Sequence, residues 1–233
     1  FNDNAPVVNH EVSISGASEK INYYLSLGYY DQEGIVGGNY GQSNYNRLSM
    51  RSNTNYTILD VSKERNFLNK IDLNVSLAYT RIKNTGISEN TEWGSVLGSA
   101  LYMSPILPLS VTDKDVIKGM EDASAGYELL RDAYGNPYTV PNYFGAYQEI
   151  NNPIGIMSKP AQQNWSHKFV PKFAFDVQLW GNLKYHFSYS ADLAFWGNES
   201  YNATKWYLSG NNKADHTGAS KRSDKGTTWQ VEN

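Results

Sequence analysis

The sequence predicts an all-β protein, an antiparallel meander that forms part of a transmembrane β-barrel, and three observations lead to this prediction. Long segments alternate between apolar and polar residues with the two-residue period of a β-strand. These segments exceed the length of about 5 or 6 residues that is usual for strands of soluble domains. The connections between them are alternately short and long, as in outer-membrane barrels.

Residues 20–34, KINYYLSLGYYDQEG, predict the first long strand. Its dry face carries apolar and aromatic side chains: Ile21, Tyr23, Leu25, Leu27 and Tyr29. Its wet face carries mostly small or polar residues: Asn22, Tyr24, Ser26, Gly28 and Tyr30. In the wall of a membrane barrel the dry face meets lipid and the wet face lines the lumen.

The same alternation predicts further strands along the chain. They are expected at 44–58, 67–82, 173–179 and 183–195, with a short strand around Val12 and Ile14 before them and the start of another at 229–233. Their wet faces carry polar and charged residues that we expect to face the lumen: Arg47, Arg51, Lys70, Asp72, Asn74, Lys184, His186 and Asp192. At a tilt of about 40°, the segment from Phe67 to Tyr79 would rise about 31 Å, enough to span an apolar band of about 25 Å.

The connecting segments fall into two classes of length. Short connections are predicted at 16–19, 60–66 and 181–182, and long ones at 32–43, 83–163 and 197–227. Because successive strands run in opposite directions, all the long connections gather at one end of the sheet. The segment 83–163 is therefore expected to be a long extracellular loop within the partial barrel domain 1–233.

This long loop is expected to contain a short helix. Its apolar residues share one helical face at i, i+3, i+4, i+7 and i+8: Trp93, Val96, Leu97, Ala100 and Leu101. Asn90 or Thr91 could cap the helix, and Pro105 and Pro108 mark its end.

Aromatic residues of the loop are the candidate ligand-binding residues: Trp93, Tyr127, Tyr134, Tyr138, Tyr143, Phe144 and Tyr147. Their rings could stack on sugars or line a peptide groove. The alternative is that they pack the loop onto the barrel or onto a lipoprotein that covers it.

Composition excludes several classes of function. The formal net charge of −3 provides no basic stripe for nucleic acid, and the absence of cysteine excludes disulfides and thiolate chemistry. No apolar run is long enough for a transmembrane helix. The four histidines lie far apart, and no HExxH, GxSxG, P-loop or Rossmann pattern occurs. We therefore predict no catalytic residues, no metal site, no cofactor and no enzymatic activity.

A soluble β-sandwich is the alternative to a membrane barrel, because its strands also alternate. A tyrosine-rich sandwich would be a carbohydrate-binding module. Strand length, the alternating connections and the charged residues at mid-strand favour the barrel.

Several motifs resemble the early barrel strands and later landmarks of SusC/RagA-type TonB-dependent transporters from the outer membranes of Bacteroidetes. The motifs are NHEVSISG at 9–16, YYLSLGYYDQEGIV at 23–36, YNRLSMR at 45–51, MSPILP at 103–108, DAYGNPY at 132–138 and WQVEN at 229–233. The resemblance covers essentially the whole chain, and the order and spacing of the motifs make it specific.

The resemblance implies a nutrient transporter for large glycans or peptides. Its barrel would have about 22 strands, of which this chain supplies about the first third. It implies an N-terminal plug inside the barrel, a SusD-like surface lipoprotein over the outer face, and energy from TonB with ExbB and ExbD through a TonB box near the plug. We expect the plug, the TonB box and the remaining strands to lie outside this chain. Glycine inside a strand usually marks close approach by another backbone, and at Gly28 we expect the plug to supply it.

Overall fold

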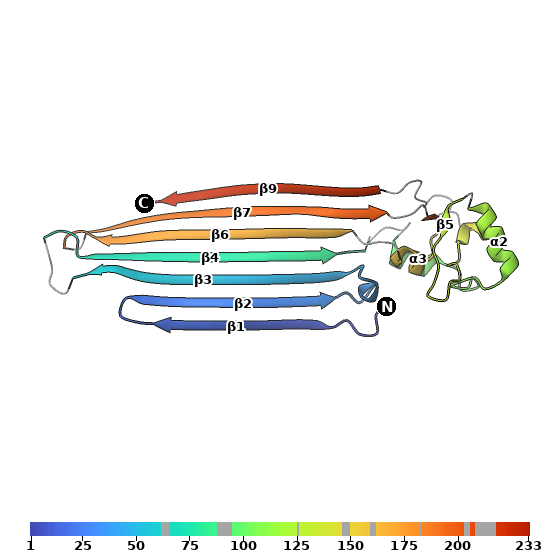
Figure 1. The fold of residues 1–233 in the computed structure, drawn as a ribbon, viewed down its shortest axis with the longest axis horizontal. Helices are drawn as coiled ribbons and strands as arrows, with labels where there is room; N and C mark the ends of the chain where they lie inside the picture. The colour runs from blue at the N-terminus through green and yellow to red at the C-terminus, as the bar shows by residue number, and fades with distance from the viewer. Residues whose placement is uncertain are drawn as a thin grey trace.

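A computed structural model of the chain describes residues 1–61, 66–87, 95–124, 126–145, 150–158, 162–181, 183–202, 206–207 and 218–233. Seven long strands form one antiparallel sheet in the order β1-β2-β3-β4-β6-β7-β9 (Figure 1). Their bounds are β1 Val7–Ala17, β2 Ile21–Glu33, β3 Asn44–Asp60, β4 Lys70–Thr85, β6 Gln163–Gln178, β7 Lys184–Asn202 and β9 Gly218–Glu232. The predicted antiparallel meander is confirmed.

The register of the sheet keeps the predicted dry and wet faces apart across every strand. Leu27 pairs with Met50, and Met50 pairs with Tyr79 on its other side. Tyr79 in turn pairs with Phe169, which pairs with Leu193. Because the side-chain period of a strand is two, one such apolar row fixes the facing of all the strands that it crosses.

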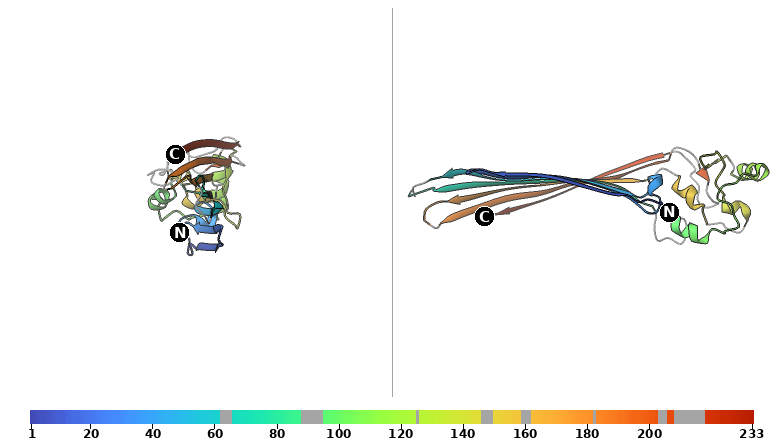
Figure 2. Two further views of the ribbon diagram at one scale, coloured as in Figure 1. Left: turned by 90° about the vertical axis from the view of Figure 1, so that its left-hand side faces the viewer. Right: turned by 90° about the horizontal axis from the view of Figure 1, so that it is seen from below.

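The strands are unusually long, from 11 residues in β1 to 19 residues in β7. Seen from the side, the sheet is a thin, twisted layer with the loop segments at one end (Figure 2). Its apolar face is not covered by any of the residues that the structure describes: Leu27 is 50% exposed and Val12 71% exposed. No helix among the described residues has the length and apolarity needed to cross a membrane.

The alternation of short and long connections is also confirmed. The strand ends joined by residues 18–20, 61–69 and 179–183 lie at one end of the sheet, and those joined by 34–43, 86–162 and 203–217 lie at the other (Figure 1).

Several predicted strand boundaries are wrong. The strand β6 begins at Gln163, ten residues before the predicted start at Phe173, and it contains Pro171 near its middle. This proline, which has no N–H to donate, lies where the pairing of β6 with β7 is interrupted between Phe169 and Lys172. At the same end of the sheet, β7 continues to Asn202, and the whole of 218–228 belongs to β9. That stretch, GASKRSDKGTT, is polar on both faces and so shows no alternation.

At the short-turn end the strand β4 begins at Lys70, so Phe67 lies outside it. The ring of Phe67 instead lies 6.0 Å from that of Trp180, which follows β6.

The long loop between β4 and β6 carries helices and a small core of its own. Its elements are α1 Val96–Tyr102, α2 Lys114–Ala123, β5 Glu128–Leu129, η2 Pro141–Phe144 and α3 Pro153–Met157, and β5 pairs in parallel with β8 Trp206–Tyr207. A further short helix, η1 Gly38–Tyr40, follows β2. The core comprises Val111, Met120, Leu129 and Val140, with Val116 and Ile117 packed against it.

The predicted helix in this loop exists, but its start and its buried face differ from the prediction. It begins at Val96, and the hydroxyl of its N-cap, Ser95, accepts a hydrogen bond from the Gly98 N–H. The expected caps Asn90 and Thr91 lie outside the described residues. Val96 and Ser99 are buried, whereas Leu101, on the predicted apolar face, is exposed.

Candidate functional site

The polar face of the seven-stranded sheet gathers the side chains that sequence reasoning assigned to a lumen. The register places all of them on this one face: Arg47, Arg51, Lys70, Asp72, Asn74, Lys184, His186 and Asp192. Their common facing follows from paired positions such as Thr57 with Asp72 and Asp176 with His186. That this face lines a lumen stays a prediction.

Charged side chains of the polar face pair with one another, both near the short-turn end and near the middle of the strands. Lys70 Nζ lies 3.1 Å from Asp72 Oδ2, and the Thr57 hydroxyl donates a 2.7 Å hydrogen bond to Asp72 Oδ1. Lys168 Nζ lies 2.8 Å from Asp192 Oδ2.

The His186 Nδ1 atom lies 2.7 Å from Asp176 Oδ1, within hydrogen-bonding distance. Sequence reasoning missed both partners, Lys168 and Asp176. Asp176 stands between the apolar residues Phe175 and Val177, so the alternation there could have placed it on the polar face. Lys168, in contrast, lies in the part of β6 that the sequence did not predict.

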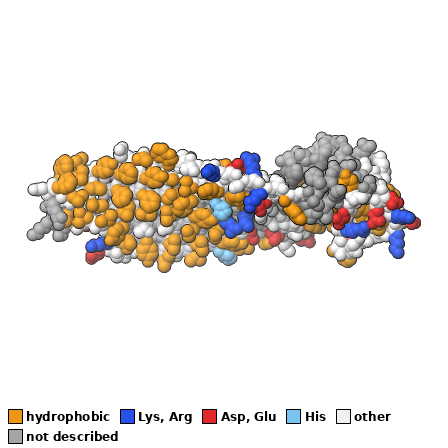
Figure 3. All heavy atoms as spheres, turned by 45° about the horizontal axis from the view of Figure 1, so that its top comes forward, with side chains coloured by type: hydrophobic (Ala, Val, Ile, Leu, Met, Phe, Trp, Pro, Cys, Tyr) orange, Lys and Arg blue, Asp and Glu red, His pale blue; other side chains and the backbone are white. Residues whose placement is uncertain are grey.

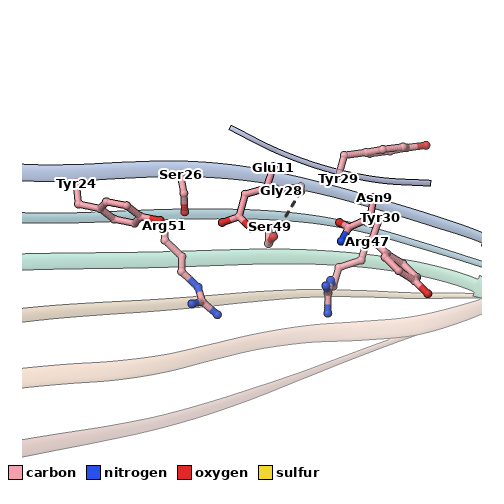
Figure 4. Close-up of a pocket in the computed structure, with 10 residues that line it drawn as sticks. All are labelled: Asn9, Glu11, Tyr24, Ser26, Gly28, Tyr29, Tyr30, Arg47, Ser49 and Arg51. Atoms are coloured by element: carbon pink, nitrogen blue, oxygen red, sulfur yellow. Dashed lines mark hydrogen bonds between the residues drawn. The ribbon is translucent and has the colours of Figure 1, made fainter. Parts of the chain in front are cut away.

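Two arginines of β3 form a cationic surface beside β1 and β2. Arg47 and Arg51 line a hollow of about 200 Å³ together with Glu11 and Tyr30. Figure 4 shows both side chains extending to the same side, away from β1. The Arg47 guanidinium carbon lies 5.5 Å from the centre of the Tyr30 ring, a cation–π arrangement. Neither arginine has a carboxylate partner within the described part of the chain, so both are available to a carboxylate, sulfate or phosphate.

An aromatic and amide cluster lies on the same face near the long loops. It lines a hollow of about 320 Å³ with Asn84, Asn164, Asn198, Trp196, Arg222 and Asp224 among its residues. The three asparagines are neighbours in one cross-strand row, and Arg222 Nε donates to Asp224 Oδ2 at 2.7 Å. Trp196 is 43% exposed. An exposed indole beside amide groups could stack on a sugar ring and bond its hydroxyls.

Sequence reasoning missed this cluster because the predicted strand ended at Phe195. The residues beyond it were expected to form a long loop.

The predicted ligand-binding aromatics of the loop are dispersed. Tyr134 is 91% exposed, whereas Tyr138 is buried in the loop and Tyr127 is half-buried. The rings of Tyr143 and Phe144 are both exposed and meet edge to face, 5.2 Å apart. Trp93 and Tyr147 lie outside the described residues.

The motif DAYGNPY forms a tight turn around the Asp132 carboxylate. Asp132 Oδ1 accepts hydrogen bonds from the backbone N–H groups of Tyr134 and Asn136, each at 2.9 Å. Gly135 has a φ of +84°, a conformation that glycine adopts without strain. Desolvation acts to raise the pKa of the Asp132 carboxyl, but these hydrogen bonds, with those from the Ser110 and Asn136 side chains, hold the pKa below its ordinary value.

Within the described ranges, no three histidine, aspartate or glutamate side chains are placed to hold a metal ion.

The chain is similar to a TonB-dependent receptor along most of its length. No family model matches it. Over 172 residues, or 74% of the chain, it is 44% identical to TonB-dependent receptor P26 of Formosa agariphila. The chain spans 13% of the length of that relative. The similarity supports a TonB-dependent receptor family and does not distinguish a subtype within it.

Proposed function

We propose that this chain forms part of the barrel wall of an outer-membrane TonB-dependent transporter of the SusC/RagA type, which imports glycans or peptides too large for porins. One observation carries the proposal. A single antiparallel sheet of long strands has a continuous, exposed apolar face on one side and a charged, hydrogen-bonded face on the other.

The apolar face has the dimensions of a lipid-facing band. On β4 the apolar side chains run from Ile71 to Tyr79, which corresponds to a rise of about 21 Å at a strand tilt of about 40°. At the short-turn end of the sheet, the band is continued by two further aromatic residues, Phe67 and Trp180, whose rings lie 6.0 Å apart. Aromatic residues at both borders of an apolar band of about 25 Å are typical of outer-membrane barrels.

A soluble carbohydrate-binding sandwich explains these features less well. A sandwich buries the apolar face of one sheet against a second sheet. In the described residues all seven long strands belong to one sheet, and its apolar face carries large exposed side chains such as Leu25 and Phe173. In water, an exposed apolar surface of this extent would favour aggregation, whereas in a membrane it is the lipid contact.

The substrate classes follow from the polar face. Trp196 with its asparagine neighbours suits a sugar ring, and the Arg47 and Arg51 surface suits anionic groups on either a glycan or a peptide. By the family resemblance, a SusD-like lipoprotein would cover the long loops, and TonB with ExbB and ExbD would drive import through the plug of the full-length protein.

Uptake by whole cells tests the transport proposal. Cells expressing the full-length protein should accumulate labelled oligosaccharides or peptides above the porin limit, and cells lacking either this protein or TonB should not. Uptake that persists without TonB would contradict the proposal.

A tryptophan substitution tests the role of the polar face. Trp196→Ala should weaken uptake by about tenfold if its indole supplies a stacking contact of about 1.4 kcal/mol. Trp180→Ala is the matched control, because Trp180 is 52% exposed but lies at the short-turn end. Equal uptake by the two variants would remove Trp196 from the substrate path.

A further inference from the structure

A cluster of basic side chains lies on the apolar face of the sheet, at its border with the long loops. We call this cluster, which comprises Arg81, Lys83, His167 and Lys225, the cationic border. One cross-strand row from β4 to β9 runs through Arg81, His167, Phe195 and Lys225. Lys83 lies two residues beyond Arg81 on the same face. In Figure 3 the basic side chains gather where the field of hydrophobic side chains ends.

The charge of the cationic border is not neutralised within the described part of the chain. Arg81, Lys83 and Lys225 form no ion pair there, although Arg81 and Lys83 are only partly exposed. Nearby on this face, Glu199 is paired with Lys221 at 2.6 Å. The strands β4, β7 and β9 therefore present net positive charge at this end of the apolar face.

Two further acidic residues, Asp31 and Glu33, lie on the same face and at the same end of the sheet, but on β2, which β3 separates from β4. Asp31 accepts a 3.3 Å hydrogen bond from Asn46, and Glu33 accepts one of 3.1 Å from Asn2. Neither carboxylate forms an ion pair with a member of the cationic border in the described residues.

Aromatic and apolar side chains adjoin the cations. The Tyr79 hydroxyl and His167 Nδ1 are 2.8 Å apart, which holds the imidazole at the border. The Trp165 ring lies 5.7 Å from that of His167. Directly inward, the next row on this face is apolar and includes Tyr79, Phe169 and Leu193. A ligand that fits both rows has anionic groups and hydrocarbon chains in one molecule.

We propose that the cationic border binds the phosphate groups of an outer-leaflet membrane lipid, whose acyl chains lie along the apolar rows. The inference rests on the proposed membrane-spanning function. It is carried by charge complementarity, because basic side chains at a membrane surface attract anionic headgroups. Their position at the long-loop end assigns the site to the outer leaflet, since the long loops of outer-membrane barrels are extracellular.

Lipid binding by the purified full-length protein tests the inference. The protein is held in zwitterionic detergent, and binding of a diphosphorylated glucosamine lipid (lipid A), of the same lipid after dephosphorylation, and of inorganic phosphate is measured. The diphosphorylated lipid should bind, and the other two should bind far more weakly. Equal binding of the dephosphorylated lipid, or competition by inorganic phosphate alone, would overturn the inference.

Charge substitutions locate the site. Changing Arg81, Lys83 and Lys225 together to glutamine should lower the apparent affinity by about two orders of magnitude, or about fivefold for each cation. A matched triple variant, Lys20→Gln, Lys114→Gln and Lys118→Gln, removes the same charge elsewhere and should bind as the native protein does. Unchanged binding by the first variant would overturn the inference.

Two further measurements separate the possible failures. The single variant Lys225→Gln changes an exposed side chain and should assemble even if the triple variant does not; its affinity should still fall about fivefold. If the full-length protein does not fractionate with the outer membrane, the proposed function fails. If it does so and the phosphorylated lipid does not bind, the lipid site alone is wrong.

Discussion

Trp165 of β6 lies across Gly197 of β7, its partner in the sheet, so that a β-carbon added to Gly197 would lie 2.8 Å from Trp165 Cζ2. The same carbon would also overlap the backbone carbonyl oxygen of Arg222 in β9. Two more glycines of the sheet lie under an aromatic ring of a neighbouring strand: Gly16 under Tyr23 and Gly226 under Trp196. Aromatic cover of glycine is a known device for fixing strand register.

Replacing Gly197 should therefore weaken the pairing of β6, β7 and β9. Gly197→Ala forces a carbon against a backbone atom that cannot move freely, and we expect a loss of about 1–3 kcal/mol in stability. The change would be measured as a lower temperature of heat-modifiable mobility in the full-length protein. Gly86→Ala is the control, since nothing lies within 4 Å of a β-carbon there. If both variants are equally stable, the close contact at Gly197 is not real.

The facing of β4 can be tested by two neighbouring substitutions. Leu73 lies on the apolar face between Tyr56 and Phe175, so Leu73→Arg should cost about 2–4 kcal/mol if this face meets lipid. Asp72→Asn loses the exposed pair with Lys70 but keeps an oxygen for the Thr57 hydroxyl, and should cost less than about 1 kcal/mol. Assembly in the outer membrane is the measurement, and equal tolerance of the two changes would refute the lipid-facing assignment.

Cysteine labelling tests the same assignment on β3. The chain has no cysteine, so a single introduced thiol reports on its own position. Met50→Cys should react with a lipid-soluble maleimide, and Asn53→Cys with a water-soluble one, because the two residues are exposed on opposite faces. Ser26 is unsuitable as the polar site, since it is 6% exposed. The facing is wrong if the two reagents show the reverse preference.

The sequence alone predicts correctly which side chains share a face in those strands where apolar and polar residues alternate strongly. The faces of β2, β3 and β4 are as predicted, because each apolar position pairs with another, as Leu27 does with Met50. Alternation failed in β9, where residues 218–228 are polar on both faces. There the strand is defined by its pairing with β7, a long-range contact that local sequence does not encode.

Gly28 illustrates how an expectation from sequence can have a nearer explanation. A β-carbon at Gly28 would lie 2.7 Å from Ser49 Oγ, and the nearest backbone atoms, the carbonyl oxygens of His10 and Ser49, would be 4.0 Å away. The Ser49 hydroxyl itself donates to the Gly28 carbonyl at 3.4 Å. A side chain of the adjacent strand thus accounts for the glycine, and an approach by a plug stays a prediction.

The candidate site was only partly predictable for a similar reason. The charged positions on the polar face of β3, β4 and β7 follow from the two-residue alternation of each strand. Two of them, Asp192 and His186, have partners on the neighbouring strand β6, namely Lys168 and Asp176. Register decides which of them meet, and register depends on bulges such as that between Thr57 and Leu59.

Deletion of the loop segment 113–147 should separate substrate or lipoprotein binding from assembly of the sheet. The segment contains α2 and three members of the small core, Met120, Leu129 and Val140, so this unit is removed almost whole. None of its described residues belongs to the seven-stranded sheet, and loops tolerate deletion better than paired strands. We expect normal assembly and loss of uptake or of co-purification with a SusD-like lipoprotein. Unchanged uptake and co-purification would assign both functions to other loops.

The turn around Asp132 should loosen in acid. Its carboxyl has a folded-state pKa below the ordinary value of 3.8, so the unfolded turn takes up a proton more readily than the folded one. The stabilisation is therefore fully present at neutral pH and is lost as the pH falls through the folded pKa, below 3.8. Amide exchange at Tyr134 and Asn136, corrected for the intrinsic effect of pH, should accelerate over that range.

The Ser124 amide, which donates to the Met120 carbonyl at 2.9 Å, is the internal control, because its acceptor does not titrate. Asp132→Asn retains an oxygen acceptor without the charge, so this variant should lose the pH dependence at Tyr134 and Asn136 and exchange faster than the native protein at neutral pH. If exchange at these two amides changes with pH no more than at Ser124, the carboxylate does not hold the turn.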